Sequence, residues 1–404
     1  MVNRKSYTKL ILGLAFVLAV VLLVPIILAS GWRLIGAGSG RGDPAGLTGF
    51  GKQLVRINNQ IDYTLFGKSN IPGIIIGENR QLFESGSLRA WYGQDYAGED
   101  TIALRMRQLK VLQDTLSLRG KTFALVITAG KGTALADQLP ESSDAARGKT
   151  NYETYLEYAA EYGITLLDFN RYFRDNKDYA QFPLFSRQGS RWSHYGACLA
   201  ADSILRFIEN SQNIDLPGIK WFVIDLAEAK GPDYDLGSGL NLIFKLKRQK
   251  MAYPRIYYEP EAGKVKPSIL LIGDTSADLF HDLNLSNAFS GYDFLSYNPG
   301  MLPDSINNPF AKAGSEILEL MNEKDAVILL CGEANLGDLG WGFIRGAYEV
   351  LYERYLQAEV ANLATYIRSD RNWMNHIREK AAEWGLPVDS VVMIDANWGV
   401  RENR

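Results

Sequence analysis

Short apolar runs alternate with segments of helical period along most of the chain. Runs suited to buried strands occur at 74–76, 121–131, 164–170, 267–276 and 325–336. Apolar residues recur at helical spacing in 100–120, 150–163, 194–210, 346–369 and 371–385, whereas 211–266 is less regular. Strands that are apolar throughout and alternate with helices are typical of a parallel sheet covered by helices on both faces. The pattern predicts an α/β fold.

The longest apolar run lies near the N-terminus, where residues 10–30 carry no charge. About 20 apolar residues suffice to cross a bilayer. Arg4, Lys5 and Lys9 precede the run, so the positive-inside rule places residues 1–9 in the cytoplasm. We expect a single transmembrane anchor in the inner or plasma membrane, with the rest of the chain facing the periplasm or the cell exterior. A cleaved signal peptide, with small residues at Ala29 and Gly31, is the alternative.

A glycine-rich segment follows the apolar run and is predicted to be a tether over 31–55. Residues 56–404 are then expected to form one extracytoplasmic domain. The 47% hydrophobic and 22% charged residues exclude wholesale disorder, and the net charge of −3 gives no indication of nucleic acid as a partner. Cys198 and Cys331 do not form a CxxC pair, so no zinc or redox motif is present and no metal or cofactor is predicted. Two buried thiols are expected, and a disulfide is the alternative in an exported domain.

Two loops are candidates for a functional site. In parallel sheets, ligands bind at the carboxyl ends of the strands. There the sequence places Gly273-Asp274-Thr275-Ser276 and the loop from Gly332 to Asn335. The chain has only three histidines, His194, His281 and His376, from which any histidine-based mechanism must draw.

Four segments in order resemble a known family. They are IIIGENRQLFESG, ALVITAGKGTALADQLP, PLFSRQGSRWSHYGACLAADSI and ILLIGDTSADLF. Together they resemble the SGNH-like proteins of extracellular polysaccharide O-acetylation, of the alginate O-acetyltransferase type, over most of residues 70 to 400. The resemblance implies a flavodoxin-type, SGNH-like sheet and a Ser–His–Asp mechanism that moves an acetyl group to a sugar hydroxyl. It also implies an exported polysaccharide and a multispan membrane acyltransferase as partners.

The catalytic positions of that family are replaced in this chain. On the resemblance, Gly189 stands at the Asp position and Arg191 at the His position, while Trp192 keeps the Trp. Arginine stays protonated at neutral pH and cannot act as a general base. The nucleophile position falls on Thr275, or on Ser276 if the loop is shifted by one residue. His194, three residues after Arg191, could replace the missing base if its loop is also shifted.

The other polar candidates suggest binding roles. Asp274 could hold its loop by accepting bonds from backbone amides. Asn335 could donate to an oxyanion or stabilise its own loop. Arg191 could grip a uronate carboxylate with its bidentate fork, or form a surface salt bridge. We place Arg191, Trp192, Asp274 and Asn335 in the predicted substrate-binding set.

Three hypotheses follow from the sequence. The favoured one is a membrane-anchored subunit of polysaccharide O-acetylation that is non-catalytic or weakly active and serves in binding or assembly. The alternative is an active O-acetyltransferase or acetylesterase that uses Thr275 or Ser276 with His194. The third is an unrelated exported α/β protein.

Overall fold

The computed structural model describes residues 49–140, 146–260, 262–296 and 314–402. The chain divides into two units, Met1–Ile57 and Asn58–Arg404. The described part of the first unit is the start of helix α2 (Gly49–Ile61), which begins inside the tether predicted over 31–55. The predicted membrane segment at 10–30 lies outside the described residues. Among the described helices, none combines the length and apolarity that a membrane span requires.

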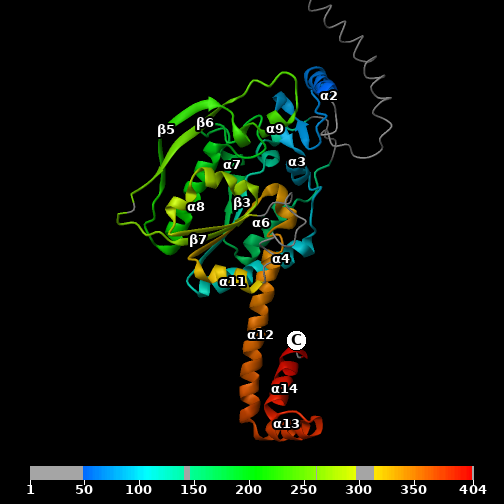
Figure 1. Ribbon diagram of the computed structural model, residues 1–404, viewed down its shortest axis with the longest axis vertical. Helices are drawn as coiled ribbons and strands as arrows, with labels where there is room; N and C mark the ends of the chain where they lie inside the picture. The colour runs from blue at the N-terminus through cyan, green and yellow to red at the C-terminus, as the bar shows by residue number, and fades with distance from the viewer. Residues whose placement is uncertain (1–48, 141–145, 261, 297–313, 403–404) are drawn as a thin grey trace, which may run out of the picture. The chain divides into compact units, whose positions relative to one another are not determined.

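A five-stranded parallel sheet forms the centre of the second unit (Figure 1). The order across it is β4 (Leu166–Asp168), β3 (Thr122–Thr128), β9 (Ala326–Gly332), β7 (Ser268–Gly273) and β8 (Gly291–Ser296). β3 pairs with β9 along its whole length, and every residue of both strands is buried. Burial of both sheet faces explains why these strands are apolar throughout rather than alternating.

Helices cover both faces of the sheet. Successive residues of β3 face opposite sides, so Ala124 and Val126 pack in one apolar cluster and Phe123, Leu125 and Ile127 in another. The first cluster includes side chains from α7 (Phe169–Asn176), α8 (His194–Gln212) and α10 (Asp278–Asp282). The second includes side chains from α4 (Glu99–Leu118), α6 (Asn151–Tyr162), α11 (Gly314–Glu323) and α12 (Phe343–Ser369). The predicted α/β class with a parallel sheet between helices is therefore confirmed.

Two helices of the sandwich begin at side-chain caps. Thr150 and Glu153 form a capping box at the start of α6. Ser193 Oγ accepts from the Gly196 amide at 3.1 Å at the start of α8. Each cap satisfies an amide that the first helical turn leaves without a partner. The cap at Ser193 makes His194 the first residue of the helix, and the segment up to Trp192 runs outside it.

Smaller elements complete the second unit. Two antiparallel pairs lie outside the main sheet, β1 (Ile74–Ile76) with β2 (Leu82–Glu84), and β5 (Ile219–Glu228) with β6 (Lys250–Tyr258). The short helices are α3 (Ser85–Tyr92), α5 (Lys131–Ala134) and α9 (Asp235–Gly239). Single turns and short helical segments are η2 (Asp62–Phe66), η3 (Glu78–Arg80), η4 (Ala136–Gln138), η5 (Gly231–Asp233), η6 (Thr275–Ala277), η7 (Leu285–Ala288) and η9 (Glu333–Asp338).

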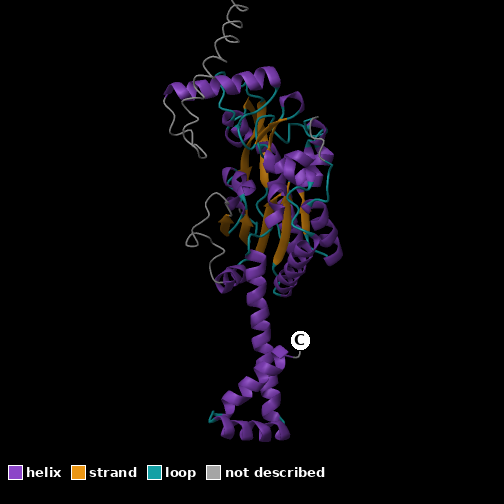
Figure 2. Cartoon of the chain, turned by 90° about the vertical axis from the view of Figure 1, so that its right-hand side faces the viewer, coloured by secondary structure: helices purple, strands orange, loops and turns teal. Residues whose placement is uncertain are grey.

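The last three helices form a group with its own apolar cluster. α12 runs out of the sandwich, and α13 (Arg371–Trp384) and α14 (Val388–Glu402) pack against its outer part (Figures 1 and 2). Val360, Ile367, Ile377 and Val391 are among the residues of this cluster. The sequence pattern predicts α12 and α13 at nearly these bounds but does not predict α14.

Candidate functional site

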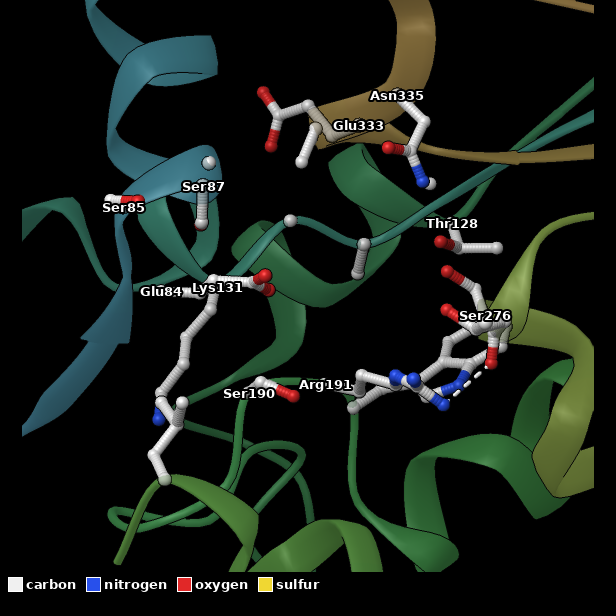
Figure 3. Close-up of a pocket in the computed structure, with 18 of the residues that line it drawn as sticks. Glu84, Ser85, Ser87, Thr128, Lys131, Ser190, Arg191, Ser276, Glu333 and Asn335 are labelled. Atoms are coloured by element: carbon white, nitrogen blue, oxygen red, sulfur yellow. Dashed lines mark hydrogen bonds between the residues drawn. The ribbon is translucent and has the colours of Figure 1, made fainter. Parts of the chain in front are cut away.

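A cavity of about 540 Å³ lies at the carboxyl ends of three neighbouring strands. The segments that follow β3, β7 and β9 contribute Thr128–Lys131, Thr275–Ser276 and Gly332–Asn335 to its lining. The loop 190–192 closes one side, and residues 84–87 with Arg89 close another (Figure 3). This is the place at which parallel sheets bind ligands, because the loops at that edge converge. Both loops selected from the sequence therefore reach the same cavity.

Asp274 joins the loops after β7 and β9. Its Oδ1 accepts from the Ser276 amide at 2.8 Å. Its Oδ2 accepts from the Gly332 amide and from Asn335 Nδ2, both at 2.7 Å. The carboxylate is fully buried and both of its oxygens are engaged, so Asp274 holds the loops together. Asn335 is correspondingly used to bind Asp274.

Thr275 and Ser276, the two candidate nucleophiles, both line the cavity. Gly332 makes room for the second of them, since a Cβ added there would lie 2.8 Å from Ser276 Oγ and 3.1 Å from Asp274 Oδ2. The hydroxyl of Ser276 therefore packs directly over the Gly332 backbone. The loop places hydroxyls at the cavity but supplies no imidazole.

Arg191 reaches from its own loop to the segment that carries the two hydroxyls. Its Nη1 donates to the Thr275 carbonyl at 2.7 Å and to Asp278 Oδ2 at 3.2 Å. Figure 3 shows the guanidinium extended toward the Ser276 segment. A permanently charged group thus occupies the position at which the resemblance places the base, and it is bonded to the backbone of the candidate nucleophile.

Trp192 lies under this end of the cavity as part of the core. Its side chain is 1% exposed, and its ring centroid is 5.8 Å from Phe173, 5.8 Å from Phe280 and 6.0 Å from Phe169. Among the described residues its Nε1 has no hydrogen-bond partner. Trp192 therefore lines the cavity and also packs into the core beneath it.

Gly189 leaves no space for a side chain. A Cβ at this position would lie 2.4 Å from the Pro232 carbonyl oxygen and 2.9 Å from Asp233 Cα. Both contacts are to backbone, which cannot swing aside as a flexible side chain can. The local fold therefore excludes the aspartate that the resemblance expects at this position.

His194 lies in a different cavity, of about 450 Å³, together with Asp233, Tyr253 and Asp282. Burial lowers the pKa of its imidazole. His194 was predicted to reach the nucleophile loop if its own loop is shifted. Instead it is the first residue of α8 and lines this second cavity, whereas Thr275 and Ser276 line the first. His281 packs on Phe294 and His376 lies on α13. All three histidines belong to the described residues, and none lines the 540 Å³ cavity.

Sequence reasoning missed two buried charged groups at the cavity. Lys131 is 1% exposed, and Nζ donates to the Ser186 carbonyl at 2.7 Å and to the Gly189 carbonyl. Glu333 is 3% exposed, and Oε1 accepts from Thr133 Oγ1 at 2.5 Å. Burial raises the pKa of Glu333 to about 7 and lowers that of Lys131 to about 7. The available signal was their place close after two buried strands, since Lys131 lies three residues after β3 and Glu333 directly follows β9.

The cavity carries equal numbers of acidic and basic side chains. Glu84, Asp235 and Glu333 are acidic, and Arg89, Lys131 and Arg191 are basic. Asp235 accepts from the Ser190 amide at 2.9 Å and from its hydroxyl at 2.5 Å. Burial and the neighbouring Asp235 raise the pKa of Glu84. The arrangement offers hydroxyls, carboxylates and guanidinium groups to a polar ligand.

The described residues contain no cluster of three or more metal-ligating side chains suited to an ion. Cys198 and Cys331 are both buried free thiols, so they are not joined by the disulfide that the sequence left open.

Comparison with known proteins gives a family match. Residues 74–289, more than half of the chain, match the family model described as the SGNH hydrolase-like domain of the acetyltransferase AlgX. No curated protein matches the chain.

Among solved structures, the chain is similar to the O-acetyltransferase domain of Pseudomonas putida AlgJ, with 17% identity, a TM-score of 0.46, and coverage of 66% of this chain and 92% of that one. The chain is also similar to Pseudomonas aeruginosa AlgX, with 16% identity, a TM-score of 0.43, and coverage of 66% of this chain and 66% of that one. For Bacillus cereus PatB1 the identity is 14% and the TM-score 0.44, with coverage of 65% of this chain and 96% of that one.

Proposed function

The chain belongs to the family of SGNH hydrolase-like domains of the AlgX acetyltransferase type, and from this premise we propose that it serves polysaccharide O-acetylation as a non-catalytic or weakly active subunit for binding or assembly. Its cavity is proposed to bind an exported polysaccharide, and its partner is proposed to be a multispan membrane acyltransferase. The apolar segment 10–30 is proposed to anchor it in the inner or plasma membrane, with the domain facing the periplasm or the cell exterior.

One observation carries the non-catalytic part of the proposal: Arg191 occupies the place of the base and is bonded to the Thr275 carbonyl. A hydroxyl becomes a strong nucleophile only when a neighbouring group takes its proton. A guanidinium cannot do so at neutral pH. The closed space at Gly189 supports the same reading, because no aspartate could orient a base from that position.

Binding is supported by what the cavity still offers. Among the described residues, both bonds of Arg191 are made by Nη1, so Nε and Nη2 can face an anionic group of a ligand. The side chain is 30% exposed and lines the cavity. The fork of donors matches a carboxylate, such as that of a uronate. Ser85, Ser87 and Thr128 add hydroxyls that can bond to those of a sugar.

Hydrolysis of p-nitrophenyl acetate by the full chain, purified in a mild detergent, tests the catalytic status. The wild type is compared with Thr275→Ala, Ser276→Ala and His194→Ala. We expect all four proteins to hydrolyse the ester equally, at the rate of a denatured sample. Turnover in the wild type that is lost in His194→Ala and in one hydroxyl variant would instead establish the alternative, an active acetyltransferase or acetylesterase.

Isothermal titration with alginate oligosaccharides, used as a uronate probe, tests the binding role. Arg191→Lys keeps the charge but removes the planar fork, so we expect at least a fivefold weaker affinity. Arg206→Lys is the matched control, because Arg206 is exposed on α8 and pairs with Asp202 on the same helix. Equal affinity of Arg191→Lys and the wild type would remove Arg191 from the binding site.

A further inference from the structure

The buried ammonium of Lys131 points at the backbone of a single loop. Nζ donates to the carbonyl oxygen of Ser186 at 2.7 Å, to that of Gly189, and to that of Arg187 at 3.5 Å. An ammonium has three N–H donors, and burying it is costly unless they are bonded. The loop thus supplies the acceptors that make this lysine tolerable at 1% exposure.

The loop that Lys131 holds leads directly into the cavity wall. Other bonds fix its first half, since the Leu82 amide donates to the Arg187 carbonyl at 2.9 Å and the Gly237 amide to the Gln188 carbonyl at 2.9 Å. Lys131 is the donor to Gly189, the last residue before Ser190 and Arg191. Figure 3 shows the Lys131 side chain running from the strand end down past Ser190.

We propose that Lys131 is a positioning residue of the cavity: it holds the carbonyl oxygens of Ser186 and Gly189 and so fixes the loop that presents Ser190 and Arg191. The fixing of the loop is independent of what the cavity binds. Its consequence for ligand affinity rests on the proposed function.

The charges around Lys131 make this role dependent on pH. Asp235 and Asp233 face Lys131 and favour its ammonium form, whereas burial lowers its pKa to about 7. Glu84 and Glu333 face the same cavity, and burial raises the pKa of Glu333 to about 7. Above pH 7 the neutral amine has two N–H donors left for three carbonyls. The loop should therefore open more often as pH rises through 7.

Amide hydrogen exchange of the full chain, followed by mass spectrometry, tests the positioning role of Lys131. In Lys131→Met we expect exchange in the peptide 186–192, corrected for intrinsic rates, to rise at least tenfold. Lys121→Met is the matched control, because Lys121 also donates to a backbone carbonyl, that of Lys324 at 2.7 Å, next to the opposite end of β3. If the peptide 186–192 exchanges in Lys131→Met at the same rate as in the wild type, the proposal is overturned.

The pH series of the unmutated chain gives a second measurement, which holds even if Lys131→Met does not fold. We expect the protection of 186–192 to fall between pH 6 and pH 8.5 in the wild type and in Glu333→Gln. It should stay level in Lys131→Arg, because a guanidinium does not titrate there. If the protection of 186–192 does not change with pH in the wild type, the loop is held by contacts other than Lys131. The same conclusion follows if the fall in protection is absent from Glu333→Gln.

The two proposals can fail separately. Titration with alginate oligosaccharides reports on the proposed function, while loop exchange is measured without any ligand. If the wild type binds no oligosaccharide but Lys131→Met still releases the loop, the proposed binding role fails and the positioning role stands.

Discussion

Replacing Glu333 by glutamine should remove a large pH dependence from the stability of the domain. The Glu333 carboxyl is 3% exposed, and Oε2 has no hydrogen-bond partner among the described residues. Gly130 lies against it, because a Cβ there would come within 1.7 Å of Oε2. Burial disfavours the carboxylate and outweighs the neighbouring Thr133 and Asn170 side chains, which lower the pKa, so that it rises from 4.5 to about 7.

The sign and size of the effect follow from linkage. The native state binds the Glu333 proton more tightly than the unfolded chain does, so the stabilisation is complete below pH 4.5 and is lost as pH rises through 7. At about 1.4 kcal/mol per pH unit, the total loss is about 3 kcal/mol. A glutamine does not titrate, so Glu333→Gln should not lose this contribution.

Urea unfolding followed by tryptophan fluorescence, from pH 4 to pH 9, measures the free energy of unfolding of both proteins. Their difference should be level below pH 4.5, change by about 3 kcal/mol in favour of the variant up to pH 7, and stay level above it. Lys131 titrates in both proteins, so its contribution cancels. The exposed Glu157→Gln serves as the control. A difference that is constant from pH 4.5 to pH 7 would refute the burial argument.

Two further substitutions test the loop geometry. Gly189→Asp should destabilise the fold by more than about 2 kcal/mol, without gain of esterase turnover, because its Cβ would lie 2.4 Å from the Pro232 carbonyl; Gly148→Ala, with 3.5 Å to its nearest neighbour, should unfold like the wild type in the same thermal melt. Asp274→Asn should lose about 1–3 kcal/mol in urea unfolding, since an amide cannot accept all three bonds. The exposed Asp114→Asn is its control, and an equal midpoint for both would contradict the role of Asp274.

The regular elements of the core could be predicted from the sequence because their periodicity reflects burial. The strand expected at 121–131 is β3, and the helix expected at 150–163 is α6. The ribbon β5–β6 was missed in the irregular span 211–266, because its strands lie outside the main sheet and are only partly buried. α14 was missed because few of its side chains, such as Val391 and Ala396, are buried, and only against α12 and α13 in its own cluster.

The sequence predicted the chemistry of the candidate site, but not the directions in which its side chains point. That Arg191 cannot act as a base follows from its side chain alone. That His194 faces another cavity depends on where α8 begins, and a shift of one residue there would rotate the imidazole by about 100°. The fold class, the two loops at the strand ends and the replaced catalytic residues are therefore properties of the sequence.

Only the tertiary structure decided which polar groups at the site are hydrogen-bonded to one another. Asp274 is hydrogen-bonded to Asn335, which lies 61 residues away in the sequence, and Lys131 to Gly189, which lies 58 residues away. Glu333 is hydrogen-bonded to Thr133, which lies 200 residues away. Local patterns extend over a few turns of helix or one strand, whereas these bonds arise where separate strand ends converge at one edge of the sheet. Burial at that edge also sets the pKa values of Lys131 and Glu333, because it depends on every segment packed around them.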